Sequence, residues 1–399
     1  MKKIFILLIF VLFLTGCSSR TTQKEVTFWT LQMGDFAPYI NNIIKNYELK
    51  NPNVKIKWID VPFSEGEKRT LAAVMTDVPP DLINLNPDFS AILAQKGTLQ
   101  EINPIFLTDF VPEIIEALKY KEKIFAIPWY ATSAITIYNK NLWAKTKISN
   151  LPKTYKDLAE ISELVKKNSC AYSFLPTITE NDTMAKVLNK YGVSSPNDFD
   201  GKVSNDVFNM FKELYKKDLI PPETITMTHR EALEQYMAGK VVFYQGGANF
   251  LNLIKENAPK VYAETDVTEQ IKGPLGQNDF SVMNFVIPLK AKNKEEALDF
   301  CLYLTNEENQ LELAKLTNVV VTNSKALNDS FYNDYSNLTA KARSISAKQI
   351  KNVMPSLKQK QNQKEINLLI NSTVQSVLLN KKKTDKLLQN LKKDSMIFQ

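Results

Sequence analysis

Strand-like and helix-like segments alternate near the start of the chain, and this order constrains the fold more than any other feature. The segments 26–31, 54–58 and 81–86 are rich in strand formers or in alternating apolar residues. A helical stripe opened by Pro38 separates the first two, and a helical segment through Val74 separates the last two. The order strand, helix, strand, helix, strand predicts a right-handed α/β unit with a largely parallel sheet.

The loops that follow these strands contain the first candidate site residues. Open parallel sheets bind ligands at the carboxyl ends of their strands. Gln32 follows the first strand, and Asn86 and Asp88 follow the third. These polar residues are therefore candidate ligand-binding residues. Asn86 and Asp88 fit turn and helix-capping roles equally well.

The rest of the chain indicates a second α/β lobe rather than a larger first sheet. The segment 123–143 is extended, "VVFYQGG" at 241–247 has the pattern of a strand ending in a glycine pair, and 279–288 is extended again. Helices are expected over 155–167, 207–217 and 230–238. We therefore predict two α/β lobes joined by extended crossing segments.

The N-terminus has the features of an export signal. Two lysines precede the apolar residues 4–14, a run shorter than the roughly 20 residues that a membrane span needs. The next residues, "LTGC", end at Cys17 and resemble the bacterial lipobox, in which the cysteine is acylated and becomes the first mature residue. Residues 1–17 are thus expected to be a lipoprotein signal peptide and 18–25 a polar tether. An unmodified cysteine behind a signal peptide is the alternative.

Few residues are available for metal or covalent chemistry. Beyond Cys17 the chain holds two cysteines, Cys170 and Cys301, and one histidine, His229, which cannot build a usual structural zinc site. No nucleophile elbow, phosphate-binding loop or dinucleotide fingerprint is present. Cys301 lies on an apolar helical face and is expected to be a buried free thiol. We expect no metal, no cofactor and no catalytic residue, although carboxylate pairs for glycoside hydrolysis stay open.

The net charge of +7 is accompanied by a lysine-rich C-terminal stretch, 380–393. Leu387, Leu388 and Leu391 are spaced for one helix face, and the lysines fall mostly elsewhere, which is typical of a solvated helix. Aromatic and basic residues do not interleave as they do on nucleic-acid surfaces, so no nucleic acid partner is expected.

The chain also contains, in order, "VTFWT", "YELKNPNVKIKWIDVPF", "LAAVMTDVPPDLINLNPD", "GTLQEINP", "KIFAIPWYATSAITIYNKNLW", "LPKTYKDLAEI", "REALEQYMAGKVVFYQGG", "VIPLKAKNKEEALDFCLYLTNEENQLELAKLTN" and "VMPS". Each segment alone is only a weak match to a known family. In their order and spacing they resemble the extracellular solute-binding proteins of family 1, the receptor lipoproteins of bacterial ABC importers for sugars.

The resemblance implies a periplasmic-binding-protein-like α/β fold, with two lobes, a hinge of crossing segments and a ligand cleft between the lobes. The implied lobes are 26–130 completed by about 281–320, and 133–278 completed by about 323–399. The implied crossings lie near 130–133, 280–283 and 320–323.

Further ligand-binding candidates lie at these crossings and on the second lobe. Trp129 and Tyr130 are placed where a ring can stack on the C–H surface of a sugar, and packing between the lobes is the alternative for Trp129. The other candidates are Gln245, Gly246, Gly247, Asn249, Met283 and Asn284. Glycine backbone lets a ligand approach closely, and a capping role is the alternative for Asn249.

One departure from the family bears on the expected ligand. Many members carry proline and tryptophan after the glycine pair, whereas this chain has Ala248 and Asn249 there. Phe250 is the candidate replacement for the missing ring. A smaller or more polar ligand than an oligosaccharide therefore stays open.

The sequence thus predicts the substrate-binding receptor of an ABC importer, expected to be a monomer. It would capture a sugar or related polyol at the periplasmic or outer face of the cytoplasmic membrane, held there by its lipid, and deliver the ligand to the permease subunits. A receptor for a polyamine, a phosphorylated polyol or a metal complex is the alternative within the binding class. An exported glycan-hydrolysing lipoprotein is the alternative of another class, and a structural or adhesive lipoprotein is a third.

Overall fold

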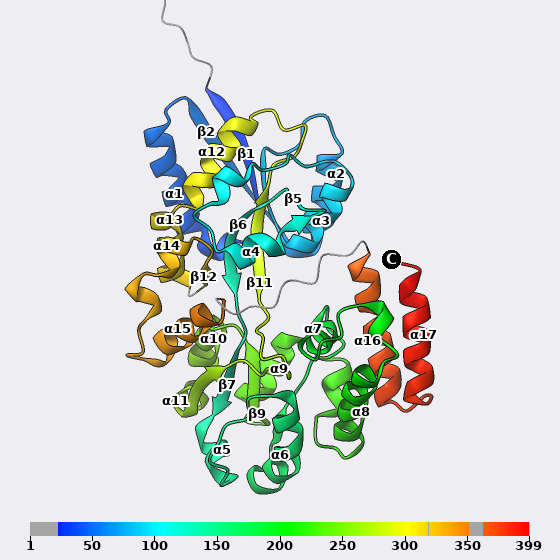
Figure 1. The fold of residues 1–399 in the computed structure, drawn as a ribbon. Helices are drawn as coiled ribbons and strands as arrows, with labels where there is room; N and C mark the ends of the chain where they lie inside the picture. Colours follow the sequence, from blue (N-terminus) through cyan, green and yellow to red (C-terminus); the bar gives the residue numbers. More distant parts are fainter. Residues whose placement is uncertain (1–22, 318, 351–361, 399) are drawn as a thin grey trace, which may run out of the picture.

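Two β-sheets divide the protein into two lobes (Figure 1). The computed structural model describes residues 23–317, 319–350 and 362–398. The sheet of lobe 1 has six strands in the order β12-β6-β11-β3-β1-β2, and the sheet of lobe 2 has four in the order β10-β7-β9-β8. This is the predicted two-lobed α/β architecture.

The lobe 1 sheet is mixed: its three N-terminal strands are parallel, as the sequence order predicts, and two later strands run antiparallel to their neighbours. Its strands are β1 (Lys24–Leu31), β2 (Val54–Val61), β3 (Leu82–Leu85), β6 (Ile127–Thr132), β11 (Ser281–Val286) and β12 (Val320–Val321). β1 pairs in parallel with β2 and β3, whereas β11 runs antiparallel to β3 and β6. The carboxyl ends of β1, β2, β3 and β6 therefore lie at one edge of the sheet.

Helices cover both faces of this sheet. They are α1 (Ala37–Lys50), α2 (Phe63–Val74), α3 (Pro87–Gln95), α4 (Pro112–Ala117), α12 (Lys294–Leu304), α13 (Glu307–Thr317) and α14 (Ser324–Leu327), with the hairpin β4 (Lys119–Tyr120) and β5 (Lys123–Ile124) beside them. α1 begins near Pro38 and buries the stripe Ile40, Ile43 and Tyr47, as the helical spacing predicts. One apolar cluster lies on each face of the sheet.

Lobe 2 is built around the smaller sheet. Its strands are β7 (Ile135–Asn139), β8 (Tyr172–Phe174), β9 (Val241–Gly246) and β10 (Thr265–Glu269). Its helices are α5 (Lys140–Lys145), α6 (Tyr155–Ser169), α7 (Thr183–Lys190), α8 (Lys202–Lys216), α9 (His229–Met237), α10 (Phe250–Asn257), α11 (Pro259–Glu264), α16 (Gln363–Leu378) and α17 (Thr384–Met396). β8 and β9 are parallel, so their carboxyl ends share an edge.

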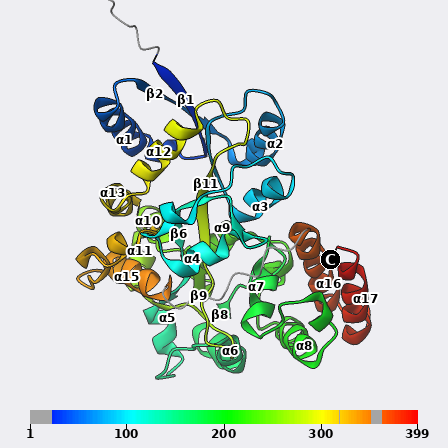
Figure 2. The ribbon, with the colours of Figure 1, turned by 45° about the horizontal axis from the view of Figure 1, so that its top comes forward.

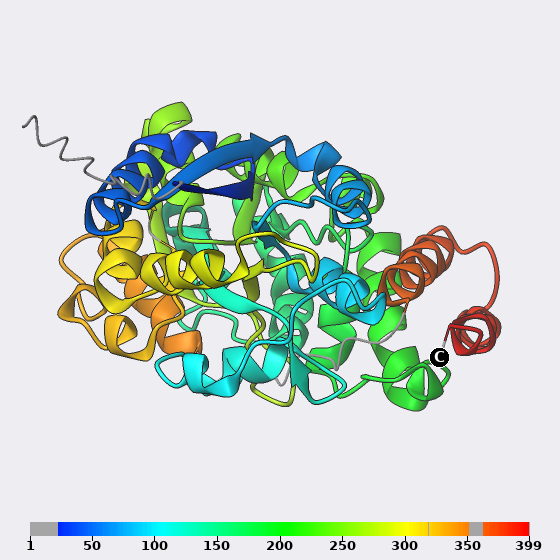
Figure 3. The ribbon, with the colours of Figure 1, turned by 90° about the horizontal axis from the view of Figure 1, so that it is seen from above.

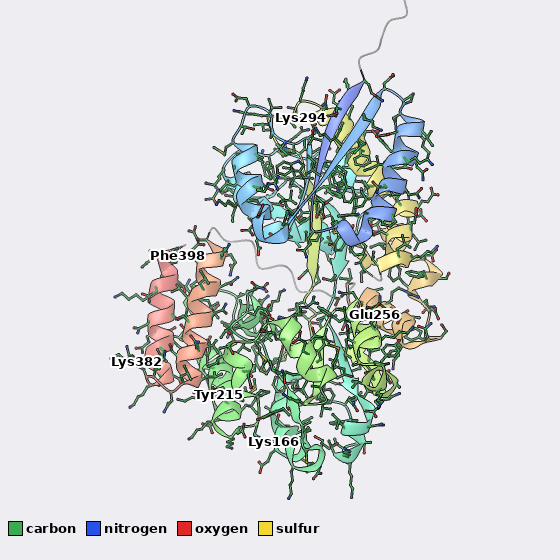
Figure 4. The ribbon with its side chains drawn as sticks, turned by 180° about the vertical axis from the view of Figure 1, so that it is seen from behind. Lys166, Tyr215, Glu256, Lys294, Lys382 and Phe398 are labelled. Carbon is green, nitrogen blue, oxygen red and sulfur yellow. The ribbon has the colours of Figure 1, made fainter. Side chains whose placement is uncertain are left out.

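The lysine-rich tail forms the second helix of a hairpin against α8. Leu388 and Leu391 of α17 are buried, while Lys386 and Lys393 of the same helix are exposed, as predicted for a solvated helix face. Lys382 lies at the turn between α16 and α17, at the end of the hairpin away from lobe 1 (Figure 4). Seen from above, the hairpin stands to the side of both sheets (Figure 3).

Three segments connect the lobes. β6 ends at Thr132 and β7 begins at Ile135, so the chain first changes sheets at 133–134. It returns between β10 and β11, through residues 270–280. The third crossing differs from the expected 320–323, because the segment after β12, including Leu327 and Tyr332, still packs in the lobe 1 core. The chain instead leaves lobe 1 through α15 (Leu338–Ile350), which contacts both β12 and β10.

A buried polar network ties these three segments together. Gln270 Nε2 donates to Ser133 Oγ at 3.2 Å and Gln349 Nε2 donates to the same oxygen at 3.0 Å. The Gln270 backbone N–H donates to Gln349 Oε1 at 2.7 Å. Each of these three residues comes from a different crossing segment. Hydrogen bonds therefore hold the three segments together at the hinge.

The described residues include two cysteines, Cys170 and Cys301. Cys301 is a buried free thiol, as predicted, and Cys170 is exposed and free. Cys17 and the export signal lie outside the described residues. Across the described ranges, no helix is both long enough and apolar enough to cross a membrane.

Candidate functional site

The candidate site lies where the two sheets present their strand ends to each other. β6 of lobe 1 leads directly into β7 of lobe 2, and Ile135 at the start of β7 pairs with Gly246 at the end of β9. The carboxyl ends of β1, β2, β3 and β6 therefore face the carboxyl ends of β8 and β9 across the hinge. α3 of lobe 1 stands opposite α7 of lobe 2 in the same region (Figure 2).

The loop after β1 is held in a fixed turn. Gln32 is exposed and has a positive φ of 51°, and its backbone N–H donates to Val61 O at 2.9 Å. Asp60 at the end of β2 accepts hydrogen bonds from Met33 N at 2.9 Å and Thr30 Oγ1 at 2.7 Å. The turn directs the Gln32 side chain away from the core, where a ligand can reach it.

The loop after β3 combines a capping residue with a charged one. Asn86 is the N-cap of α3, and its Oδ1 accepts a hydrogen bond from Phe89 N at 2.8 Å. Asn86 therefore has the helix-capping role that the sequence offered as the alternative to ligand binding. Asp88 follows in the first turn and keeps an exposed face. Loss of water around it, and then repulsion from Asp182 of lobe 2, raise the pKa of the Asp88 carboxyl, although Lys186 opposes the rise.

Trp129 does not reach the space between the lobes. Its side chain is 0% exposed, and its ring packs on Phe285 at a centroid distance of 4.7 Å. It stands at a bulge, since Met283 pairs with Tyr130 while Asn284 pairs with Pro128. The expected stacking role is therefore corrected: a ring without exposed surface packs the core and offers no face to a sugar.

Tyr130 is the aromatic candidate that remains at the first crossing. It is half-buried, and its hydroxyl donates toward Met33 Sδ at 3.9 Å. Burial raises the pKa of Tyr130 to about 12, so the phenol stays protonated and can donate a hydrogen bond. Its ring lies edge-on to Trp129 at 5.1 Å.

Gln245 and Gly246, at the end of strand β9, have structural roles inside lobe 2. The Gln245 amide is used inside lobe 2, because Nε2 donates to Thr136 Oγ1 at 2.8 Å and Oε1 accepts from Ile271 N at 3.1 Å. A Cβ at Gly246 would lie 2.4 Å from the Tyr244 ring, so this glycine makes room for a neighbouring side chain rather than for a ligand. Both residues hold the strand end in place.

The residues after β9 are more open. Gly247 is half-buried, and a Cβ there would meet Asn249 Oδ1 at 2.4 Å. Asn249 is exposed and precedes α10 without a side-chain capping hydrogen bond, contrary to the capping alternative. Phe250 lies edge-on to Tyr244 at a centroid distance of 5.8 Å and is partly exposed.

The second crossing contributes one accessible residue and one structural residue. Met283 is half-buried. Asn284 is 0% exposed, and its Nδ2 donates to Ser90 Oγ at 2.8 Å while its backbone oxygen accepts from Asn84. Asn284 therefore links β11 to α3 and β3 inside lobe 1, which corrects its expected role in ligand binding.

A polar cluster on lobe 2 was not predicted from the sequence. Glu180, in the loop after β8, accepts from the backbone N–H and the side-chain Nδ1 of His229 at the start of α9. Thr177 Oγ1 lies 3.0 Å from the same Nδ1. Burial would raise the pKa of Glu180, but the hydrogen bonds and charge of His229 outweigh it and lower the pKa. Residues about fifty positions apart carry no local sequence signal of such a contact.

These groups provide hydrogen-bond donors, acceptors and aromatic rings on two facing edges, a combination suited to a polar ligand. Within the described ranges no group of three or more His, Cys, Asp or Glu side chains could hold a metal ion.

Comparisons with known proteins agree on one class. The profile of the family described as "Bacterial extracellular solute-binding protein" matches residues 32–311. The diacetylchitobiose binding protein DasA of Streptomyces coelicolor is 22% identical over 330 residues, covering 76% of this chain and 74% of that protein. The multiple sugar-binding protein of Streptococcus mutans is 23% identical and covers 72% of this chain and 73% of its own length.

The structural comparison agrees with the fold. A crystal structure of a periplasmic-binding protein from Synechococcus sp. MITs9220, in complex with zinc, superposes with a TM-score of 0.85 at 25% identity. The superposition covers 94% of this chain and 98% of that one.

Proposed function

Because the chain belongs to the family of bacterial extracellular solute-binding proteins, we propose that it is the substrate-binding receptor of an ABC importer and that its ligand is a sugar or related polyol. The names of the relatives support the ligand class, since DasA is named as a diacetylchitobiose binding protein and the Streptococcus mutans relative as a multiple sugar-binding protein. The permease subunits of the importer are the proposed membrane partner.

The observation that carries the proposal is the opposition of two strand edges across one hinge. Accessible polar and aromatic groups stand on both edges, with Gln32 and Tyr130 on lobe 1 and Asn249 and Phe250 on lobe 2. A ligand held by both edges binds the closed form better than the open one. It therefore shifts the equilibrium toward closure.

The proposed roles follow from the chemistry of each group. The Gln32 and Asn249 amides both donate and accept, which matches sugar hydroxyls. Tyr130 and Phe250 offer ring surface to the C–H face of a sugar. Asp88 and Met283 complete the lobe 1 side, and Gly247 offers backbone groups from lobe 2.

A thermal-shift panel tests the ligand class. Monosaccharides, disaccharides, maltotriose, mannitol, spermidine and glucose 6-phosphate are added separately to the full-length protein. A ligand that binds only the folded form adds about 2.7 kcal/mol of apparent stability at 100 times its dissociation constant. We expect stabilisation by at least one neutral sugar or polyol. A response confined to spermidine or to the phosphate would contradict the sugar assignment.

The same proposal includes lipid anchoring at Cys17. The lipobox-like residues before Cys17 support it, and a soluble body on a short tether fits a receptor that stays close to its permease. Cys17→Ser should leave the folded body intact and move the protein from the detergent phase to the aqueous phase in phase partitioning. A variant that stays in the detergent phase with unchanged efficiency would contradict the anchor.

A further inference from the structure

Helix α3 of lobe 1 faces helix α7 of lobe 2 (Figure 2), and a charged residue lies at the start of each. Asp88 belongs to the first turn of α3, and Asp182 is the N-cap of α7. Lys186, one turn into α7, places its Nζ 3.1 Å from the Asp182 carboxylate and 3.4 Å from Ser281 Oγ. Because Ser281 begins a strand of the lobe 1 sheet, the Lys186 ammonium contacts groups of both lobes.

The carboxylates around Lys186 keep it charged. Loss of water around the ammonium would lower the pKa of Lys186. Asp182, Asp279 and Asp88 together outweigh that effect and raise the pKa above its ordinary value. The cation is therefore stabilised by three acids, of which Asp88 lies on lobe 1, Asp182 on lobe 2 and Asp279 on the second crossing.

The same surroundings disfavour the ionised form of Asp88. Dehydration, Asp182 and, more weakly, Glu67 disfavour its ionised form, and the attraction of Lys186 offsets only part of this cost. When the lobes separate, Asp88 moves away from Asp182. Ionised Asp88 thus favours separation of the lobes, and the positive charge of Lys186 counters it.

We propose that Lys186 is the cation that permits the lobes to close, because its ammonium pairs with Asp182 of lobe 2 and donates to Ser281 of lobe 1, where α3 with Asp88 faces α7. Lys186 is then a positioning residue, which affects ligand affinity through the open–closed equilibrium rather than through contact with the ligand. Only this consequence for affinity rests on the proposed function. The effect on closure holds in the protein without ligand.

An ion pair between the lobes supplies a matched control. Lys364 of α16 lies 3.3 Å from Glu67 of α2, but the two side chains are 69% and 47% exposed. Exposed pairs contribute little because water screens them and because two long side chains must be ordered. Removal of the Lys364 charge is therefore expected to change closure much less than removal of the Lys186 charge.

The experiment measures the distance between the lobes in the full-length protein without ligand. One spin label is attached to the exposed native Cys170 in lobe 2 and the other to Lys45→Cys, an exposed position of α1 in lobe 1. Lys186→Gln should raise the ratio of long to short distances in pulsed electron paramagnetic resonance by roughly three- to tenfold. Lys186→Arg should retain the wild-type ratio, and Lys364→Gln should change it little.

Asp88→Asn separates the charge effect from a structural one. On the Lys186→Gln background it should return the distances toward wild type, and alone it should increase the short-distance population, which keeps the proposal testable if Lys186→Gln fails to fold. Wild-type distances in folded Lys186→Gln would overturn the proposal. So would an Asp88→Asn substitution without effect on either background. Since no ligand is added, this outcome is independent of whether the thermal-shift panel finds a sugar.

Discussion

The Trp129 ring is a central part of the lobe 1 core. It is 0% exposed and packs between Phe285 and Tyr130. Trp129→Ala should therefore lower the free energy of unfolding by about 3 to 5 kcal/mol, the cost of truncating a buried aromatic residue. Denaturant unfolding measures this loss, and calorimetric titration with the sugar that stabilises the protein measures affinity.

Tyr130→Ala is the matched comparison for this prediction. Tyr130 is half-buried at the site, so its removal should weaken sugar binding by roughly tenfold while costing less stability than Trp129→Ala. The account of these residues is wrong if Trp129→Ala loses affinity and keeps its stability.

The ion pair of Asp279 and Lys190 gives the stability a defined pH dependence. The two side chains lie 3.1 Å apart and are 17% and 3% exposed. Burial would raise the pKa of Asp279, but Lys190 and Lys186 lower it below its ordinary value of 3.8. Ionised Asp279 thus stabilises the fold above about pH 4, and this contribution is lost as the pH falls through the lowered pKa.

Asp279→Asn tests that dependence. The variant leaves Lys190 without its carboxylate, so it should lose on the order of 3 kcal/mol at pH 7. Below pH 4 wild type should lose this advantage, and the two unfolding free energies should converge. Urea unfolding from pH 7 to pH 3 measures both curves. A constant difference across this range would contradict the assigned role of the Asp279 charge.

Single residues also show where sequence reasoning stops. The position of Gln32 after a strand was predictable because strand ends follow from local patterns. The burial of Trp129 and Asn284 depends on a bulge between β6 and β11, two strands about 150 positions apart, which no local pattern reveals. The contact of Glu180 with His229 is hidden for the same reason.

At the scale of elements, the second crossing packs closely against α7. A Cβ at Gly273 would lie 2.3 Å from the backbone oxygen of Lys190, and backbone cannot move aside as a flexible side chain can. Gly273→Ala should therefore lower the free energy of unfolding by about 1 to 3 kcal/mol, a typical cost of overpacking. Gly34→Ala is the control, because the nearest atom to its Cβ would be at 3.5 Å.

Chemical denaturation of both glycine variants provides the measurement. Equal losses of unfolding free energy in the two variants would mean that helix α7 moves to accommodate the added methyl group. That result would contradict the tight packing of the second crossing against α7.

Most elements followed from periodicity and turn signals. The strands at 26–31 and 54–58 and the helices near 155–167 and 230–238 all appear, with ends shifted by a few residues. The third crossing lies later than the 320–323 that the family resemblance implied, because β12 pairs with β6 and the segment after it stays in the lobe 1 core.

For the whole molecule, the order of segments predicted two α/β lobes, and the sheets confirm them. The relative placement of the lobes could not be read from the sequence, since it depends on contacts such as Gln270 with Gln349 and Lys186 with Ser281. These contacts join different lobes or crossings. They decide which strand-end residues face one another.

Native mass spectrometry tests the central claim most directly, namely that the two lobes capture an intact sugar or polyol. The full-length protein is incubated with the saccharides, mannitol, spermidine and glucose 6-phosphate. The mass of each complex is measured, and then the mass of the ligand after its release. The account predicts a one-to-one complex with a neutral sugar or polyol whose mass is unchanged on release. Complexes with spermidine or the phosphate alone, or release of a shortened saccharide, would contradict it.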